Sequence, residues 1–139
     1  MKRSLKCLIL LPFDASAKRL SATVQQVLRE NKIEVLSPAA ENFRPGALWV
    51  DELLGMLRAS DFLIADVSRK NPNVIFELGV AHGLGKPFVL LLSSDADAAT
   101  LPSDLTGYQT LSYDQSNLSG LATRLARVVE SVATRVEHP

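Results

Sequence analysis

Five short apolar segments alternate with helical patterns along this chain, and the alternation limits the folds open to it. The apolar segments cover residues 5–11, 33–36, 61–66, 88–92 and 108–113. The helical patterns cover residues 17–31, 48–59, 71–85 and 118–136. Continuous apolar runs are typical of parallel strands that helices cover on both faces. We therefore predict one domain, residues 1–139, with a doubly wound, flavodoxin-like α/β fold and a five-stranded parallel sheet ordered 2-1-3-4-5.

Charge and composition exclude several classes of function. Lys plus Arg and Asp plus Glu both total 15, so the net charge is zero. Neither a nucleic-acid surface nor a polybasic membrane surface is expected from this balance. No apolar run is long enough to span a bilayer. One cysteine and two histidines are too few for a zinc site of their own. We expect no metal and no other cofactor.

The first residues, MKRSLKCLILLPFDASA, share some features with a secretory leader. The apolar stretch is at the minimum length for such a leader, contains Pro12 and is followed at once by Asp14. A first buried strand explains these residues better. We accordingly expect a cytoplasmic protein.

The helix expected after the third strand has clear boundary signals. Asn71 is a good N-cap, Pro72 suits the first helical position, and Gly85 ends the helix. Residues 74–84 read VIFELGVAHGL, with Glu77 and one histidine as the polar residues. A helix that is apolar all round must be covered all round. We therefore expect another subunit to pack on residues 72–84, giving a homodimer or a larger homo-oligomer.

Polar residues follow the first and third strands, where the predicted strand order reverses. Ligands of such sheets bind beyond the carboxyl ends of the strands at this point. The loops after these strands and the long loop at 37–47 supply the candidate substrate-binding residues: Pro12, Phe13, Asp14, Arg44, Asp66, Ser68, Asn71 and Asn73, with Arg69 and Lys70 beside them. On topology alone, caps at the strand ends explain Asp66 and Ser68 equally well.

Glu77 is the carboxylate of the otherwise apolar helix. Burying it without a partner is costly. Asn73 precedes it by one turn on the same face and can hydrogen-bond it, and the helix dipole favours a negative charge near the helix start. A carboxylate in this setting can act as a nucleophile or base. The structural alternative is an ion pair with Arg69 or Lys70.

Three blocks of the sequence resemble the nucleoside 2-deoxyribosyltransferase-like superfamily, and most closely its small bacterial TIR-like branch. They read LILLPFD, ASDFLIADVSRKNPNVIFELGVAHGLGKPFVLL and LPSDLTGYQTLSYD, so the resemblance extends over about residues 6–114. It implies cleavage or transfer at the N-glycosidic bond of a nucleoside, nucleotide or NAD-like substrate, with sites completed across a dimer interface. It also implies Glu77 as the nucleophile and Asp66 as an acidic residue that assists with the base or sugar.

The chemistry of that reaction suits two carboxylates. Breaking an N-glycosidic bond creates an oxocarbenium-like centre, which a carboxylate below the ring stabilises or captures. The sequence departs from the transferases at two positions: Asn73 falls near an acidic position of theirs, and Phe13 stands near their tyrosine after the first strand.

Other functions compete with this interpretation. A response-regulator receiver would use Asp66 as phospho-acceptor, but Asp14 alone follows the first strand and no lysine follows the fifth. A flavin protein would need a phosphate-binding loop that the first turn lacks. A binding module without turnover would use the same crevice, with Glu77 accepting from a ribose hydroxyl. A TIR-type NAD glycohydrolase is a further alternative within the enzyme class.

Overall fold

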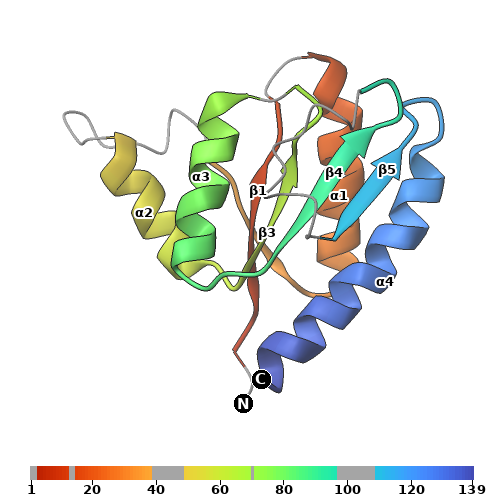
Figure 1. Cartoon of the computed structure of the whole chain (residues 1–139). Coiled ribbons are helices and arrows are strands. Elements are labelled where there is room, and N and C mark those ends of the chain that lie inside the picture. Colours follow the sequence, from red (N-terminus) through yellow and green to blue (C-terminus); the bar gives the residue numbers. More distant parts are fainter. Residues whose placement is uncertain (1–2, 13–14, 39–48, 70, 97–108) are drawn as a thin grey trace.

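Five parallel strands form one sheet at the centre of the protein (Figure 1). The computed structural model describes residues 3–12, 15–38, 49–69, 71–96 and 109–139. The strands follow the order β2-β1-β3-β4-β5, which confirms the predicted fold. Their bounds are β1 Lys6–Leu10, β2 Glu34–Leu36, β3 Phe62–Asp66, β4 Phe88–Ser93 and β5 Thr110–Tyr113.

Helices cover both faces of this sheet, as the apolar strands require. A 3-10 turn, η1 (Ala15–Ala17), leads into the first helix. The α-helices among the described residues are α1 Lys18–Glu30, α2 Trp49–Ala59, α3 Pro72–Gly83 and α4 Leu118–Glu137. Helices α1 and α4 lie on one face, and α2 and α3 lie on the other (Figure 1). None of the described helices is both long and apolar enough to cross a membrane.

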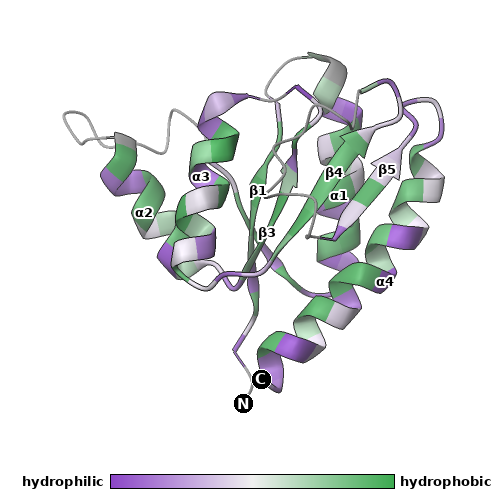
Figure 2. Ribbon diagram, in the orientation of Figure 1, coloured by the Kyte–Doolittle hydropathy of each residue, from purple (hydrophilic) through white to green (hydrophobic). Residues whose placement is uncertain are grey.

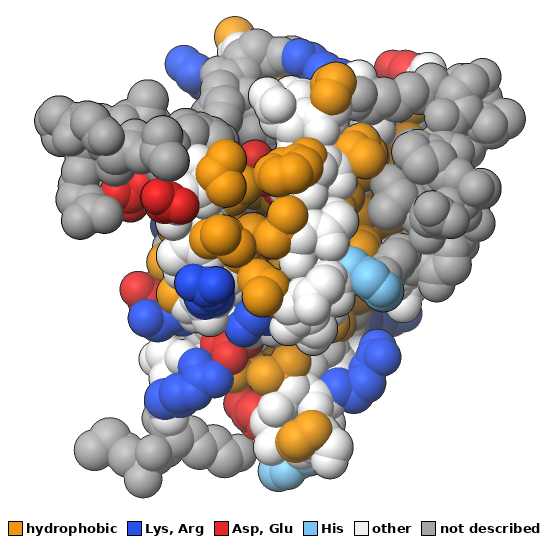
Figure 3. Space-filling model, turned by 60° about the vertical axis from the view of Figure 1, so that its left-hand side comes forward, with side chains coloured by type: hydrophobic (Ala, Val, Ile, Leu, Met, Phe, Trp, Pro, Cys, Tyr) orange, Lys and Arg blue, Asp and Glu red, His pale blue; other side chains and the backbone are white. Residues whose placement is uncertain are grey.

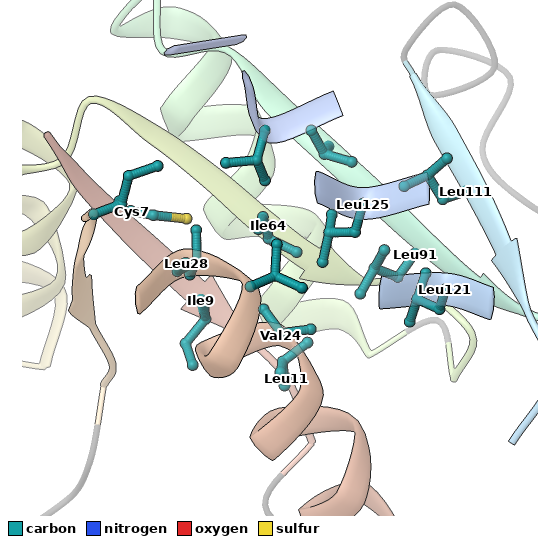
Figure 4. Packing of buried hydrophobic residues seen from close by; sticks show 14 of the residues in the cluster. Cys7, Ile9, Leu11, Val24, Leu28, Ile64, Leu91, Leu111, Leu121 and Leu125 are labelled. Atoms are coloured by element: carbon teal, nitrogen blue, oxygen red, sulfur yellow. The ribbon is translucent and has the colours of Figure 1, made fainter. Parts of the chain in front are cut away.

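Two hydrophobic clusters, one on each face, hold the three layers together. Successive side chains of β3 alternate between them: Phe62 and Ile64 join the α1/α4 cluster, whereas Leu63 joins the α2/α3 cluster. Figure 4 shows Ile64 of β3 among Leu28 of α1, Leu125 of α4 and their neighbours. In Figure 2 the central strands are green along most of their length. Burial on both faces explains why the strands read as unbroken apolar runs.

Strand register brings the carboxyl ends of the strands to one edge. Leu10 of β1 lies opposite Ala65 of β3, and Asp66 lies opposite Leu91 of β4. At the next pair of strands, Ser93 lies opposite Tyr113. The loops that follow these strands therefore begin at the same end of the sheet.

The boundaries of α3 are those that the sequence predicts. The Asn71 side chain accepts a hydrogen bond from the backbone N–H of Asn73 at 2.9 Å, and Pro72 is the first helical residue. After the helix, Gly85 has a φ of 72°, a left-handed conformation that glycine adopts without strain. The Asn71 cap fixes the start of α3 close to the end of β3.

Candidate active site

Asp66, the last residue of β3, is a buried carboxylate with a donor at each oxygen. Only 5% of the residue is exposed. Its Oδ1 accepts the backbone N–H of Ser68 at 2.8 Å. Its Oδ2 accepts the hydroxyl of Tyr113 at 2.5 Å. One donor lies in the turn after β3 and the other at the end of β5, so the carboxylate is held in one orientation at the reversal between β1 and β3.

Tyr113 is a residue that the sequence reasoning missed. It ends β5 and reaches past the end of β4 to Asp66. Burial raises the pKa of the Tyr113 hydroxyl well above its usual range, and the hydrogen bond to Asp66 adds to the rise. A hydrogen bond with Ser68 and the charge of Arg69 lower the pKa of this hydroxyl and so oppose part of the rise. The one signal in the sequence was a tyrosine at the end of a strand on the ligand edge.

Ser68 connects two strand ends. Its Oγ accepts the backbone N–H of Ser93 at 2.7 Å, which ties the turn after β3 to the end of β4. The neighbouring N–H of Ser68 holds Asp66 at the same time. Ser68, which the sequence predicts to bind substrate, therefore also stabilises the ends of β3 and β4.

Two cavities open at this edge, one on each side of Asp66. The first, here the α1 cavity, has a volume of about 450 Å³ and is lined by Pro12, Ala17, Leu20, Asp66, Ser68, Arg69, Ser93, Asp95, Ala96, Tyr113 and Gln115. The second, the α3 cavity, has a volume of about 370 Å³ and is lined by Leu10, Leu11, Pro12, Pro38, Asp66, Arg69, Asn71, Asn73, Val74 and Glu77. Both volumes are in the range of small-molecule sites.

The cavities gather most of the predicted site residues. The described members of the set all line one cavity or the other: Pro12, Asp66, Ser68, Asn71, Asn73 and Glu77. Both cavities share Pro12, Asp66 and Arg69. Phe13, Asp14, Arg44 and Lys70 lie outside the described residues. Pro38 and Gln115 join the walls without having been predicted.

Glu77 faces the sheet from the second turn of α3. It is 5% exposed and lies beside the buried residues Leu78 and Ala81. Burial raises the pKa of its carboxyl from 4.5 to about 7. Among the described residues, none forms a hydrogen bond or ion pair with this carboxyl. A buried acid without a compensating partner is a frequent feature of functional sites.

The prediction of a hydrogen bond between Asn73 and Glu77 is therefore wrong. Asn73 lies in the exposed first turn of α3, where its backbone N–H binds the Asn71 cap. Helical spacing places Asn73 and Glu77 on neighbouring positions of one face, but only Glu77 is turned far enough to be buried. Among the described residues, Glu77 forms no ion pair with Arg69 either, and Lys70, the other partner considered, lies outside the described residues.

A doubly wound sheet with a carboxylate-lined crevice at its strand reversal is the architecture of an α/β protein that binds a small ligand. Comparison with known families defines the class further. Residues 11–126 match the Nucleoside 2-deoxyribosyltransferase family, so the chain belongs to that family. No curated protein sequence matches it.

Solved structures show the same fold. A 2-deoxyribosyltransferase from Bacillus psychrosaccharolyticus is 19% identical, with a TM-score of 0.61 over 81% of this chain and 89% of that one. A CMP N-glycosidase from Clostridium botulinum is 18% identical, with a TM-score of 0.60 over 86% of this chain and 97% of that one. The TIR domains of the activated Roq1 resistosome are 15% identical, with a TM-score of 0.55 over 98% of this chain and 86% of that one.

Replacing Glu77 with glutamine tests its electrostatic setting. The folded protein holds a proton that the unfolded chain releases, so wild-type stability falls as the pH rises from 4.5 to about 7. We expect Glu77→Gln to be more stable than wild type by on the order of 2 kcal/mol at pH 8, and this gain to disappear near pH 4. Urea unfolding at both pH values measures the difference.

The matched control is Glu130→Gln, at an exposed position of α4. It should change stability by less than about 0.5 kcal/mol at either pH. A Glu77→Gln variant that is less stable than wild type at pH 8 would mean that the carboxylate has a stabilising partner.

Proposed function

We propose that this protein cleaves or transfers at the N-glycosidic bond of a nucleoside, nucleotide or NAD-like substrate, with Glu77 as the nucleophile. One observation carries the proposal: Glu77 is 5% exposed on the wall of a cavity that also contains Asp66, and no described residue forms a hydrogen bond or ion pair with its carboxyl. Membership of the Nucleoside 2-deoxyribosyltransferase family supports the class of reaction. The resemblance of the block that contains Glu77-Leu78-Gly79 to that family, which implies Glu77 as the nucleophile, supports the choice of this residue.

The proposed reaction has two steps. In the first, a carboxylate oxygen of Glu77 bonds to the anomeric carbon while the carbon–nitrogen bond breaks and its electron pair leaves with the base. A departing purine or pyrimidine base takes a proton from water, whereas the nicotinamide of an NAD-like substrate leaves as a neutral molecule and needs none. In the second, water or the nitrogen of another base attacks the anomeric carbon, loses its proton to solvent and releases Glu77. Water gives hydrolysis, and a second base gives transfer.

Asp66 has a different part in this proposal. Both of its oxygens already accept hydrogen bonds, so it is arranged as an acceptor and not as a proton donor. Each oxygen retains a further lone pair for a sugar hydroxyl. Its fixed position in both cavities also suits electrostatic stabilisation of the oxocarbenium-like sugar. We therefore assign Asp66 to the sugar and not to protonation of the base.

The walls near Asp66 and Glu77 offer the remaining contacts. Asn71 and Asn73 bring amide groups to the α3 cavity at the start of the helix, and Pro12 lies between the cavities. We propose these residues and Ser68 as substrate contacts. The predicted contacts of Phe13, Asp14 and Arg44 remain predictions, since they lie outside the described residues.

We further propose that two copies of the chain associate through residues 72–84. Helix α3 buries one face on the sheet and leaves Phe76 56% exposed. Leu84, just after α3, and Val50 of α2 are exposed as well. Figure 3, turned so that this side comes forward, shows hydrophobic side chains gathered over it. Large exposed apolar side chains in one area favour association with another protein surface.

Base release tests the proposed reaction. Wild type and Glu77→Gln are incubated with nucleosides, nucleoside monophosphates, their deoxy forms and NAD, and free base is measured by chromatography. We expect the variant to lose roughly 10³-fold or more of the rate, because the amide is a poor nucleophile. Glu130→Gln, which keeps the site intact, should match wild type. If a nucleotide raises the melting temperature and no base is released, the protein is a binding module.

The pH dependence of base release follows from the same residue. The nucleophile must be ionised, and the pKa of Glu77 is raised to about 7. We expect kcat/KM to rise about tenfold per pH unit below pH 7 and to level off above it. Initial rates between pH 5 and 9 give the profile. A rate that is flat from pH 5 to pH 7 would contradict the role of Glu77 in its ionised form.

Light scattering tests the proposed association. Wild type should have the mass of at least two chains of 15.1 kDa. Phe76→Asp should shift it towards the monomer, because a charge in an apolar contact is costly to bury. Thr123→Asp, at an exposed position of α4 on the other side of the sheet, is the control. Monomeric wild type would exclude the interface.

A further inference from the structure

The contact between Tyr113 and Asp66 joins parts of the chain that are 47 residues apart. Tyr113 ends β5, Asp66 ends β3, and β4 lies between the two strands. The tyrosine is 3% exposed and belongs to the α1/α4 hydrophobic cluster. Its ring is therefore fixed by packing, and its hydroxyl points from a rigid base to the carboxylate.

The carboxylate would be less restrained without this contact. The N–H of Ser68 holds only Oδ1, and a carboxylate with one donor still rotates about its Cβ–Cγ bond. The hydroxyl of Tyr113 takes Oδ2 and removes that freedom. Since the pKa of the hydroxyl lies above its usual range, it keeps the proton that it donates at neutral pH.

We infer that Tyr113 is a positioning residue, which holds Asp66 at the angle at which it meets the sugar of the substrate. This inference rests on the proposed function, since it assigns Tyr113 a part in the same reaction. Tyr113 acts through Asp66 and forms no bond to a reacting atom. An error of about 1 Å in a group that stabilises charge can slow a reaction about 10²-fold.

The kinetic test uses Tyr113→Phe, which removes the hydroxyl and keeps the buried ring. Asp66 interacts most strongly with the positive charge that develops in the transition state, so the loss should fall on kcat. We expect kcat for base release to drop ten- to a hundredfold while KM stays within about twofold. Ser112→Ala, which removes the neighbouring exposed hydroxyl of β5, should leave both constants unchanged.

A double-variant cycle separates positioning from a general structural effect. Tyr113→Phe is combined with Asp66→Asn, and residual base release is followed at high enzyme concentration. If Tyr113 acts through Asp66, it should slow the wild type but not the Asp66→Asn protein further. An equal loss in both backgrounds would overturn the inference, since the hydroxyl would then act on something other than Asp66.

A spectroscopic readout tests the contact without activity. The chain has two tyrosines, so in a Tyr108→Phe background Tyr113 is the single phenol. Its ultraviolet titration should begin at a lower pH once Asp66→Asn removes the carboxylate charge that raises the pKa of the hydroxyl. An unchanged titration would overturn the inference.

The outcomes distinguish this inference from the function on which it rests. If wild type releases base and Tyr113→Phe has the same kcat, the positioning role is wrong and the proposed function stands. If wild type releases no base from any probe, both are wrong. A Tyr113→Phe protein with native circular dichroism and a lowered kcat, together with the expected cycle, supports both.

Discussion

The central sheet has helices on both faces, and this constraint organises the rest of the molecule. Side chains from β1, β3 and β4 enter hydrophobic clusters on either side, so the charged residues of these strands, Lys6 and Asp66, stand at strand ends. The polar side chains of the candidate site therefore lie at the edge where the strands end. Because all five strands are parallel, their carboxyl ends meet at one edge. The two cavities and both carboxylates lie there.

The two carboxylates differ in environment although both are 5% exposed. Asp66 is surrounded by donors, from its own turn and from β5. Glu77 lies against apolar residues of α3 and the sheet, and burial alone raises its pKa to about 7. Environments that treat two acids so differently are typical of pairs with divided roles. Such a division suits the proposed roles, in which Asp66 is a fixed acceptor and Glu77 is the reactive group. The burial of Glu77 lowers the stability of the folded protein.

Much of this architecture follows from the sequence. Unbroken apolar runs predict a covered parallel sheet, and its strand order predicts the crevice that contains Asp66. The Asn71–Pro72 pair predicts where α3 starts, which places Glu77 near the crevice. Each of these steps depends on local pattern and on topological rules that hold for many proteins.

Other features depend on the direction in which a side chain points. The pattern of apolar and polar residues in the sequence does not specify that direction. The reach of Tyr113 past β4 joins positions that are distant in the chain. The hydrogen bond expected between Asn73 and Glu77 fails because a small rotation around α3 separates an exposed position from a buried one. The exposed Phe76 shows that an all-apolar helix need not be fully covered within one chain.

Trapping the covalent intermediate would identify the residue that attacks the sugar, which we propose to be Glu77. The protein is incubated with a 2-fluoro analogue of whichever nucleoside or nucleotide it cleaves, since fluorine slows the second step, and intact mass and peptide mass are measured. We expect a glycosyl adduct on the peptide that contains Glu77, and no adduct on Glu77→Gln. Turnover without an adduct, or an adduct on another residue, would contradict Glu77 as the nucleophile.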